Sequence, residues 1–297
     1  MGAVSQSLLT QYIERLASEQ FEDQQAAAIQ LLELESQAVD QVILALQHAN
    51  AQVRYMAAWI LGELGDTRAV DPLLKALNDS DSRVQNWAAR ALGELGDKRA
   101  VPTLIQMLRH AQAETRRCAV LSLGWLGASE ALPALQVLLR DHAGAVRAAA
   151  VEAMGKLDAH AFVASIHPCL RDRESWVRAA AAHALGLLRD ESAIPMLLET
   201  LKDPANWVRF QGAWALGELK TEEALTGLDI LLTEDIVNVR RAAADALAKI
   251  GSDRAIASLV NALKDPDDSV LQTVDAALHR LGYSIETEGE DSPSEVL

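Results

Sequence analysis

Two pairs of aromatic residues, each spaced four apart, are the side chains in this sequence best suited to binding another molecule. One pair is Tyr55 and Trp59, and the other is Phe210 and Trp214. Residues four apart in a helix lie on one face, so each pair would form a single patch. Only 4% of the 297 residues are aromatic. Because exposed aromatic rings bury a large area at low entropic cost, both pairs are predicted to contact a partner.

Two further tryptophans and two arginines lie near the first aromatic pair in the sequence. Trp87 and Trp125 follow that pair along the chain, and Arg90 and Arg117 lie between them. A guanidinium forms strong, often bidentate, hydrogen bonds to a carboxylate, so these arginines are candidates for binding an acidic group. For the two tryptophans a second interpretation stays open, namely that they fill gaps between helices.

Residue types that commonly perform catalysis or bind metal ions are scattered. No two of the seven histidines are four residues apart, and each is followed by Ala, Pro or Arg; they are His48, His110, His142, His160, His167, His183 and His279. Cys169 is expected in the core and Cys118 on the flank of a helix, with no base identified beside either thiol. The sequence predicts no catalytic residue, no metal site and no cofactor.

A repeat of 31 residues organises nearly the whole chain. Its copies start at Val53, Val84, Thr115, Val146, Val177, Val208, Val239 and Val270, with a weaker copy near Glu22. With the starting residue as position 1, apolar or small residues fill positions 1, 5, 8, 9 and 12, and then 18, 21 and 25. Both sets have helical spacing, so each repeat is predicted to be a first and a second helix. The pairs bury their apolar faces by stacking on one another, which predicts an all-α fold, an α-solenoid.

Helical geometry places the aromatic residues on one face of the first helices. Positions 3 and 7, which hold both aromatic pairs, point away from the core, while Trp87 at position 4 and Trp125 at position 11 lie on a flank. The two pairs are five repeats apart, at roughly 8–10 Å per neighbouring helix. That separation suits a protein or peptide better than one small molecule. Trp176 and Trp207 directly precede position 1 and are expected to pack in the turn between helices.

Glycine recurs at position 10, inside the first helix, in six repeats: Gly62, Gly93, Gly124, Gly155, Gly186 and Gly217. A glycine there costs roughly 1 kcal/mol relative to alanine. Its recurrence predicts a close approach of neighbouring first helices, beside the small residues at position 6.

Three segments are expected along the chain. Residues 1–21 form an N-terminal capping helix, and residues 22–283 form the array of about eight repeats. Residues 284–297 contain five acidic residues and no basic one, so they are expected to be a disordered acidic tail.

The charge balance restricts the classes of partner. Lys and Arg number 27 against 42 Asp and Glu, a net charge of −15. Without a basic cluster the chain is not expected to bind nucleic acid. No apolar run is long enough to span a membrane and no secretory signal is seen, so a cytoplasmic location is expected. Acids at position 11 (Glu63, Glu94 and Glu218) predict an acidic surface beside the aromatic residues, either simply solvated or binding a basic segment.

The repeated run Val-Arg-x-x-Ala-Ala-x-Ala-Leu-Gly-x-Leu-Gly-Asp resembles the HEAT-like repeats of the phycobilin lyase type, over roughly residues 22–283. The resemblance implies a right-handed superhelix whose concave face is lined by the first helices. HEAT proteins also have an Asp–Arg ladder between repeats. Here arginines at position 2 accompany acids at position 27 and are predicted to be structural: Arg54, Arg116, Arg147, Arg178, Arg209 and Arg240, with Asp79, Asp141, Asp172, Asp203, Glu234 and Asp265.

Two functions of different class follow. The first is a non-catalytic scaffold or adaptor that binds a protein or peptide on the concave face. The second is a subunit of a phycobilin lyase or another chromophore-handling factor. The E-type lyase subunits resemble the segment from Arg54 to Gly62, although their second aromatic residue is replaced here by Ile60. That resemblance implies tetrapyrrole stacking on Tyr55, Trp59 and Trp87, with Arg90 or Arg117 binding its propionates. Enzymatic activity, if present, would be of this lyase type.

Overall fold

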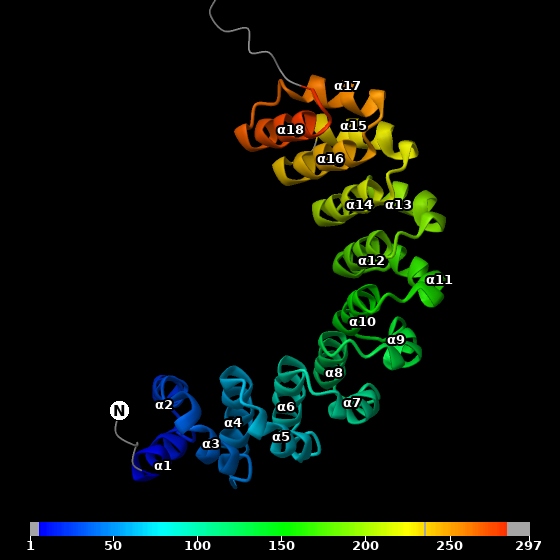
Figure 1. The fold of residues 1–297 in the computed structure, drawn as a ribbon. Coiled ribbons are helices and arrows are strands. Elements are labelled where there is room, and N and C mark those ends of the chain that lie inside the picture. Colours follow the sequence, from blue (N-terminus) through cyan, green and yellow to red (C-terminus); the bar gives the residue numbers. More distant parts are fainter. Residues whose placement is uncertain (1–5, 235, 284–297) are drawn as a thin grey trace, which may run out of the picture. The chain divides into compact units, whose positions relative to one another are not determined.

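The computed structural model describes residues 6–234 and 236–283. Within these residues all regular secondary structure is helical, and the helices alternate between longer first helices and shorter second helices (Figure 1). The chain divides into two compact units, residues 1–169 and 170–297. The predicted all-α solenoid of helix pairs is confirmed within each unit.

The first unit begins with α1 (Gln6–Arg15), which packs against α2 (Phe21–Glu33) and α3 (Val39–Ala45). Its further first helices are α4 (Ala51–Leu64), α6 (Ser82–Leu95), α8 (Ala113–Trp125) and α10 (Gly144–Lys156). Its further second helices are α5 (Val70–Ala76), α7 (Val101–Met107), α9 (Leu132–Leu138) and α11 (Val163–Ile166). Each first helix packs against the next first helix, and the second helices form the other layer (Figure 1).

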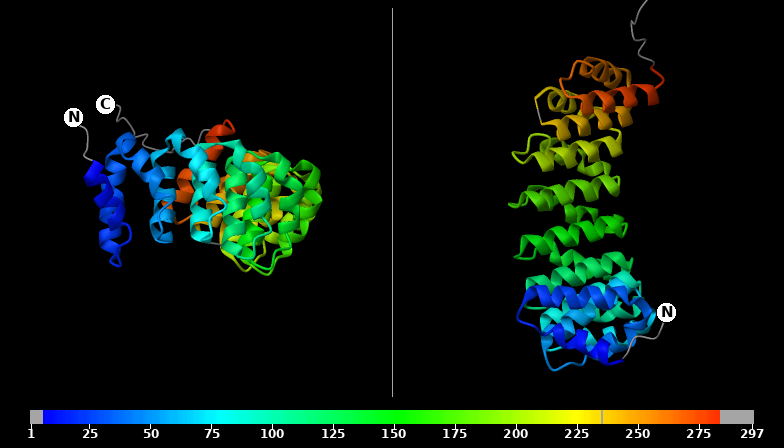
Figure 2. Two further views of the ribbon diagram at one scale, coloured as in Figure 1. Left: turned by 90° about the horizontal axis from the view of Figure 1, so that it is seen from below. Right: turned by 90° about the vertical axis from the view of Figure 1, so that its left-hand side faces the viewer.

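The second unit repeats this arrangement. Its first helices are α12 (Ser175–Leu187), α14 (Asn206–Leu219), α16 (Val237–Ile250) and α18 (Asp268–Arg280), and they lie parallel to one another in the right-hand view of Figure 2. Its second helices are α13 (Ile194–Thr200), α15 (Leu225–Glu234) and α17 (Asp253–Ala262).

Short 3₁₀ helices adjoin the second helices. Most of them directly precede a second helix: η1 (Glu35–Gln37), η2 (Thr67–Ala69), η3 (Lys98–Ala100), η4 (Ser129–Ala131), η5 (His160–Phe162), η7 (Glu191–Ala193) and η8 (Glu222–Ala224). The remaining one, η6 (His167–Arg171), takes over from α11 where Pro168 removes a backbone donor.

The core of each unit lies between the two layers and follows the repeat pattern. Position 1 of the first helix and position 21 of the second helix are fully buried in both units: Val53, Val84, Val146, Leu73, Leu104 and Leu135 in the first, and Val177, Val208, Leu197 and Leu228 in the second. Because first helices of adjacent repeats pack on one another, such as α4 on α6 and α12 on α14, stacking of repeats rather than any single helix pair supplies the core.

The turn between the two helices is set by glycine and aspartate. Gly65 has a φ of 66°, a left-handed conformation that a side chain disfavours, and its N–H donates to the carbonyls of Leu61 and Gly62. The Asp66 carboxylate then accepts from the Arg68 N–H at 2.9 Å and caps the next helical turn. This turn leads the chain from the layer of first helices to the layer of second helices. Because the repeat length is constant, each first helix presents the same positions to solvent as the one before it.

The position-10 glycines allow close helix packing, as predicted, but the neighbour differs from the prediction. A Cβ placed on Gly62 would lie 3.0 Å from the Ala91 Cβ, and one on Gly217 would lie 2.8 Å from the Ala246 Cα. Both alanines occupy position 8 of the following repeat, not position 6. The first helices are therefore offset by two positions where they touch.

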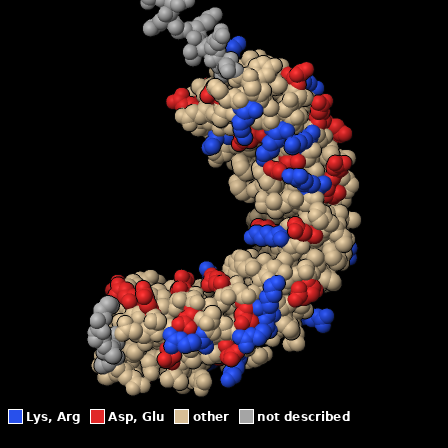
Figure 3. All heavy atoms as spheres, in the orientation of Figure 1, with Lys and Arg blue, Asp and Glu red and all other residues tan. Residues whose placement is uncertain are grey.

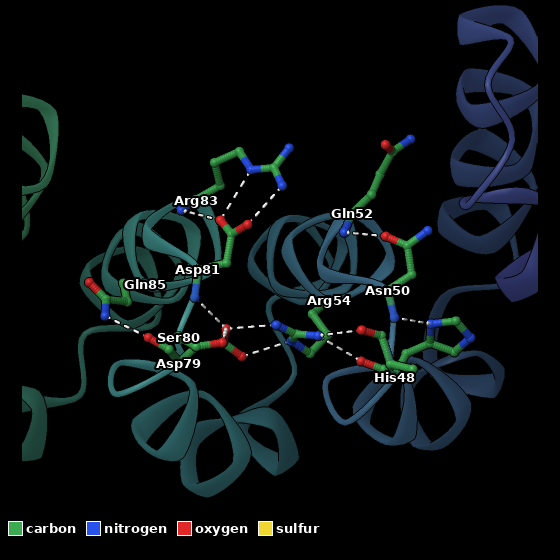
Figure 4. A network of polar contacts seen from close by, with 10 residues as sticks. His48, Asn50, Gln52, Arg54, Asp79, Ser80, Asp81, Arg83 and Gln85 are labelled. Carbon is green, nitrogen blue, oxygen red and sulfur yellow. Dashed lines mark hydrogen bonds and ion pairs between the residues drawn. The ribbon is translucent and has the colours of Figure 1, made fainter.

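The predicted Asp–Arg ladder is present in both units, and Figure 4 shows its pair Arg54 and Asp79 in the first unit. Arg54 donates to both Asp79 oxygens at 2.8 and 2.9 Å, and also to the carbonyls of His48 and Ala49. The same bidentate pair joins Arg116 to Asp141, Arg178 to Asp203 and Arg240 to Asp265. Each pair links the start of one first helix to the loop that precedes the next, which supports the structural role predicted for these residues.

No helix in the described ranges is both long and apolar enough to cross a lipid bilayer. The residues predicted to form the acidic tail, 284–297, lie outside the described residues. In the segment predicted as a capping helix, α1 buries Leu9 and Ile13 against its neighbours.

Candidate functional site

Four of the eight residues predicted to bind a partner line one groove in the first unit. The groove lies between α6 and α8 and has a volume of about 480 Å³. Trp87 and Arg90 come from α6, and Arg117 and Trp125 come from α8. The remaining lining residues are Arg83, Asn86, Glu114, Cys118 and Leu121. We call this surface groove 1.

The first aromatic pair extends groove 1 onto α4. The Trp59 ring meets the Trp87 ring edge to face, with centroids 6.3 Å apart, and the Trp59 indole N–H donates to Glu63. The guanidinium of Arg83 lies 5.1 Å from the centre of the Tyr55 ring. Three successive first helices therefore present one continuous aromatic and cationic surface.

Three arginines and one glutamate line groove 1, and each arginine has a carboxylate partner. Arg83 contacts Asp81 at 2.7 Å. The Arg90 guanidinium lies 5.2 Å from the Trp87 ring centre and donates to Glu94, while Arg117 donates to both Glu114 oxygens. Since each guanidinium has five N–H donors, both arginines keep donors for a further carboxylate. The surface thus suits an anionic group flanked by apolar or aromatic ones.

Trp87 and Trp125 differ in how far their rings are buried between neighbouring helices. The ring of Trp125 lies over Gly93, where a Cβ would be only 3.0 Å from its Cε3, yet 45% of the residue is exposed. Trp87 is half-buried beneath Arg90. Both rings contact a neighbouring helix and also face the groove, so packing and partner contact are compatible at these positions.

Cys118 lines groove 1 but is a poor nucleophile. Its thiol is half-buried and donates to the Glu114 carboxylate at 3.5 Å. Burial, followed by the negative charge of Glu114, raises the pKa of the Cys118 thiol to about 11. Because the thiolate is the reactive form, almost none is present near neutral pH.

We expect iodoacetamide to alkylate Cys118 at least tenfold more slowly in the folded protein than in the urea-unfolded chain at pH 8, because the raised pKa lowers the thiolate fraction. Mass spectrometry of peptides quantifies the product. Glu114→Gln should speed the folded-state reaction by removing a negative charge. Equal rates in folded and unfolded protein would contradict this account of the thiol.

The second aromatic pair lines a similar groove in the second unit, between α14 and α16, with a volume of about 530 Å³. Phe210 and Trp214 are joined there by Trp207, whose ring stacks on Phe210 with centroids 4.9 Å apart. The Lys249 ammonium lies 5.5 Å from the Trp214 ring centre. The other lining residues are Asn238, Arg241, Ala242, Asp245 and Ala246. We call this surface groove 2.

Groove 1 and groove 2 are the same surface of the repeat, four repeats apart. In both, the lining residues come from the residue before position 1 and from positions 3, 4, 7 and 11, with Ala246 at position 8 as an addition in groove 2. These spacings put one face of each first helix beside the same face of the next. Aromatic and cationic side chains share that face in both units.

Several lining residues were not among the predicted site residues. Arg83, Glu114 and Trp207 each directly precede position 1, and the helix begins at or before that residue in all three repeats. Extending the spacing of the aromatic pairs upstream by one helical turn would have identified them. The expectation that Trp176 and Trp207 pack in a turn is wrong, since they lie in the first turn of α12 and α14 and are 52% and 55% exposed.

The acidic surface predicted from position 11 also differs in the structure. Glu63 accepts from Trp59, Glu94 from Arg90, and Glu218 from Lys249 at 2.7 Å. These local partners compensate the carboxylates, so cationic and anionic groups are paired along both grooves and neither presents an acidic surface. Over the face shown in Figure 3, acidic and basic side chains are interspersed.

Among the described residues, no group of three or more His, Cys, Asp or Glu side chains is arranged to hold a metal ion.

A family model for HEAT repeats matches the sequence over residues 9–89, 39–118, 70–155, 163–238 and 229–279. The chain belongs to the HEAT-repeat family. In the repeats of this HEAT-repeat protein, the Asp–Arg ladder and the apolar stacking positions hold the first helices in register, and groove 1 and groove 2 lie on the surface left exposed.

Solved structures similar to this HEAT-repeat protein include one chain of the complex of CpcE and CpcF of phycocyanin lyase from Nostoc sp. PCC7120. It is 27% identical, with 80% of this chain and 94% of that chain covered and a TM-score of 0.51. The YibA protein of Escherichia coli is 21% identical, with coverage of 90% and 98% and a TM-score of 0.67. An engineered protein is 22% identical, with coverage of 92% and 88% and a TM-score of 0.53. The last two show the fold alone. The sequence matches none of the curated proteins.

Proposed function

We propose that this HEAT-repeat protein is a non-catalytic scaffold that binds a protein or peptide partner on the face lined by its first helices, the face predicted to be concave. The observation that carries the proposal is the repeated combination of aromatic rings and cationic groups in groove 1 and groove 2. Aromatic and arginine side chains contribute most to binding energy at protein interfaces.

The chemistry of both grooves favours an extended partner segment with carboxylates and apolar side chains. In groove 1 the rings of Trp59, Trp87 and Trp125 supply apolar area, while Arg90 and Arg117 supply donors. A single small ligand would not need two such surfaces, whereas a protein or peptide can engage both and gain affinity from their linkage.

The test is a pull-down from native lysate with the intact chain and with Tyr55→Ala/Trp59→Ala, Trp87→Ala and Trp214→Ala variants. We expect the partner to be retained by the intact chain and to bind each variant at least tenfold more weakly, about 1.4 kcal/mol or more. Mass spectrometry identifies the partner, titration with the purified partner measures its affinity, and circular dichroism confirms that each variant is folded.

Trp176→Ala is the matched control. Trp176 is 52% exposed, lies on a first helix and lines neither groove. Its replacement should leave partner binding unchanged. Equal binding by all variants would show that the aromatic residues serve packing only and would refute the proposal.

A second candidate function is a subunit of a phycobilin lyase or another chromophore-handling factor. Its support is the 27% identity to a chain of the phycocyanin lyase complex over 80% of this chain. Tyr55, Trp59 and Trp87 would then stack on a tetrapyrrole, and Arg90 or Arg117 would bind its propionates. This function predicts that purified chain mixed with a free bilin changes the bilin's visible absorbance, and that Trp87→Ala abolishes the change. An unaltered spectrum would exclude it.

A further inference from the structure

The chain leaves its last helix beside groove 2. Arg280, the final residue of α18, lies 3.4 Å from the carboxylate of Asp245, which lines groove 2. Gly282 then adopts a φ of 84°, and the Tyr283 N–H donates back to the Leu278 carbonyl at 2.9 Å. This turn ends α18 at the edge of groove 2.

The segment that follows Tyr283 has the charge that groove 2 lacks. Residues 284–297 contain Glu286, Glu288, Glu290, Asp291 and Glu295 and no basic residue. Groove 2 and its edge contain Arg241, Lys249 and Arg280 against two acids, Asp245 and the Glu218 that Lys249 contacts, which leaves one positive charge in excess. Opposite charges attract each other within a screening length of about 10 Å at 0.1 M salt, so the acidic segment is attracted to the cationic groups of groove 2 when it comes that near.

The same segment has apolar residues that fit the rings of groove 2. Ile285, Val296 and Leu297 are aliphatic, and Trp207, Phe210 and Trp214 line the groove. Fourteen residues reach at most roughly 45–50 Å when extended. The 14-residue helix α16 is only about 21 Å long at 1.5 Å per residue. The tail is thus long enough to follow the whole groove from the end of α18.

We propose that residues 284–297 bind groove 2 of their own chain and compete there with the partner. This inference rests on the proposed function, because it adds regulation to the same surface. Covalent linkage over a segment of this length gives the tail an effective concentration on the order of 1 mM. If the tail binds with a Kd of about 0.1 mM, it lowers the affinity of groove 2 for another acidic segment about tenfold.

The test is zero-length cross-linking of the full chain with a carbodiimide, which joins a lysine amine to a carboxylate in contact with it. Lys249 is the probe because its ammonium lies in groove 2 and already contacts Glu218 at 2.7 Å. We expect mass spectrometry to find Lys249 linked to tail carboxylates. The Lys249–Glu218 link, which needs no tail, is the internal positive control.

Two matched variants separate groove binding from chance proximity. Trp214→Ala, in groove 2, should reduce the tail links at least severalfold, whereas Trp125→Ala, in groove 1, should leave them unchanged. A tail in which the four glutamates become glutamine and Asp291 becomes asparagine removes the charges. A fluorescent peptide of residues 284–297 should bind this neutralised chain about tenfold more tightly than the intact chain.

A Lys249–Glu218 link without any tail link would overturn the proposal, as would equal peptide affinity for the intact and neutralised chains. If the partner is lost in Trp214→Ala but no tail link forms, the scaffold function stands and tail binding fails. If tail links form but no partner depends on the aromatic residues, tail binding stands and the scaffold function fails.

Discussion

Replacement of Arg116 by alanine is expected to lower the free energy of unfolding by about 3–5 kcal/mol. Arg116 is 5% exposed, donates to both Asp141 oxygens at 2.7 and 2.8 Å, and also donates to the carbonyls of His110 and Ala111. Without it the buried Asp141 carboxylate loses its cation. Urea denaturation followed by circular dichroism measures the loss.

The pH dependence of the lost unfolding free energy shows whether it comes from the Asp141 carboxylate left without its cation or only from lost packing. Burial alone would raise the pKa of Asp141, but hydrogen bonds from Arg116 and the Ala143 N–H outweigh it and hold the pKa below its usual value. In the intact protein this stabilisation is therefore present above about pH 4 and is lost as the pH falls further. In Arg116→Ala the burial effect prevails, so the deficit should be smaller near pH 4 than at pH 7.

Arg99→Ala is the control for Arg116→Ala. Arg99 also contacts two carboxylates, Asp97 and Asp71, but its side chain is 59% exposed. Water and salt screen such a pair, so a far smaller loss is expected. Equal losses in the two variants, or a deficit in Arg116→Ala that does not change with pH, would contradict the role assigned to burial.

Alanine at two equivalent glycines is expected to change stability in opposite directions. At Gly186 a Cβ would lie 2.8 Å from both the Ala215 Cα and the Trp214 ring, and a backbone atom cannot move without shifting α14. Overpacking of this kind typically costs about 1–3 kcal/mol. At Gly124 the nearest atom, the Ala153 Cβ, would be 3.5 Å away, an ordinary contact. There the higher helix propensity of alanine should add about 1 kcal/mol.

Urea midpoints of the two variants test this pair, with tryptophan fluorescence as a second signal. Because the added methyl group in Gly186→Ala contacts the Trp214 ring, that variant should also change the fluorescence emission of Trp214 in groove 2. Gly124→Ala should leave the Trp214 emission unchanged. Stability changes of the same sign in both variants would show that repeat position, rather than the local gap between helices, decides the cost.

Most of the fold was predictable because the repeat is a local sequence pattern that recurs along the chain. Its apolar positions indicate which residues are buried, and in one copy Gly65 marks the end of a helix and Asp66 caps the next one. Helical spacing converts that pattern into a buried face without knowledge of any distant residue. The same spacing also placed Tyr55, Trp59, Phe210 and Trp214 together with the cationic residues on the exposed face of the first helices.

The sequence could not determine which residues of adjacent repeats contact one another, because that depends on how the helices pack. The sequence identified the position-10 glycines, but only the packing of α4 on α6 shows that Gly62 meets Ala91 at position 8. Likewise, the acids at position 11 predicted an acidic surface, whereas Lys249, one repeat onward, compensates Glu218.

The periodic sequence by itself therefore determined the helix pairs, their buried faces and the face on which the half-buried aromatic pairs lie, since these follow from backbone geometry within one repeat. Only the tertiary structure decided which side chains of adjacent helices share a groove. It also decided the charge of each groove, because that depends on distances of a few Å between residues such as Arg90 and Trp87, or Lys249 and Glu218 from the preceding first helix.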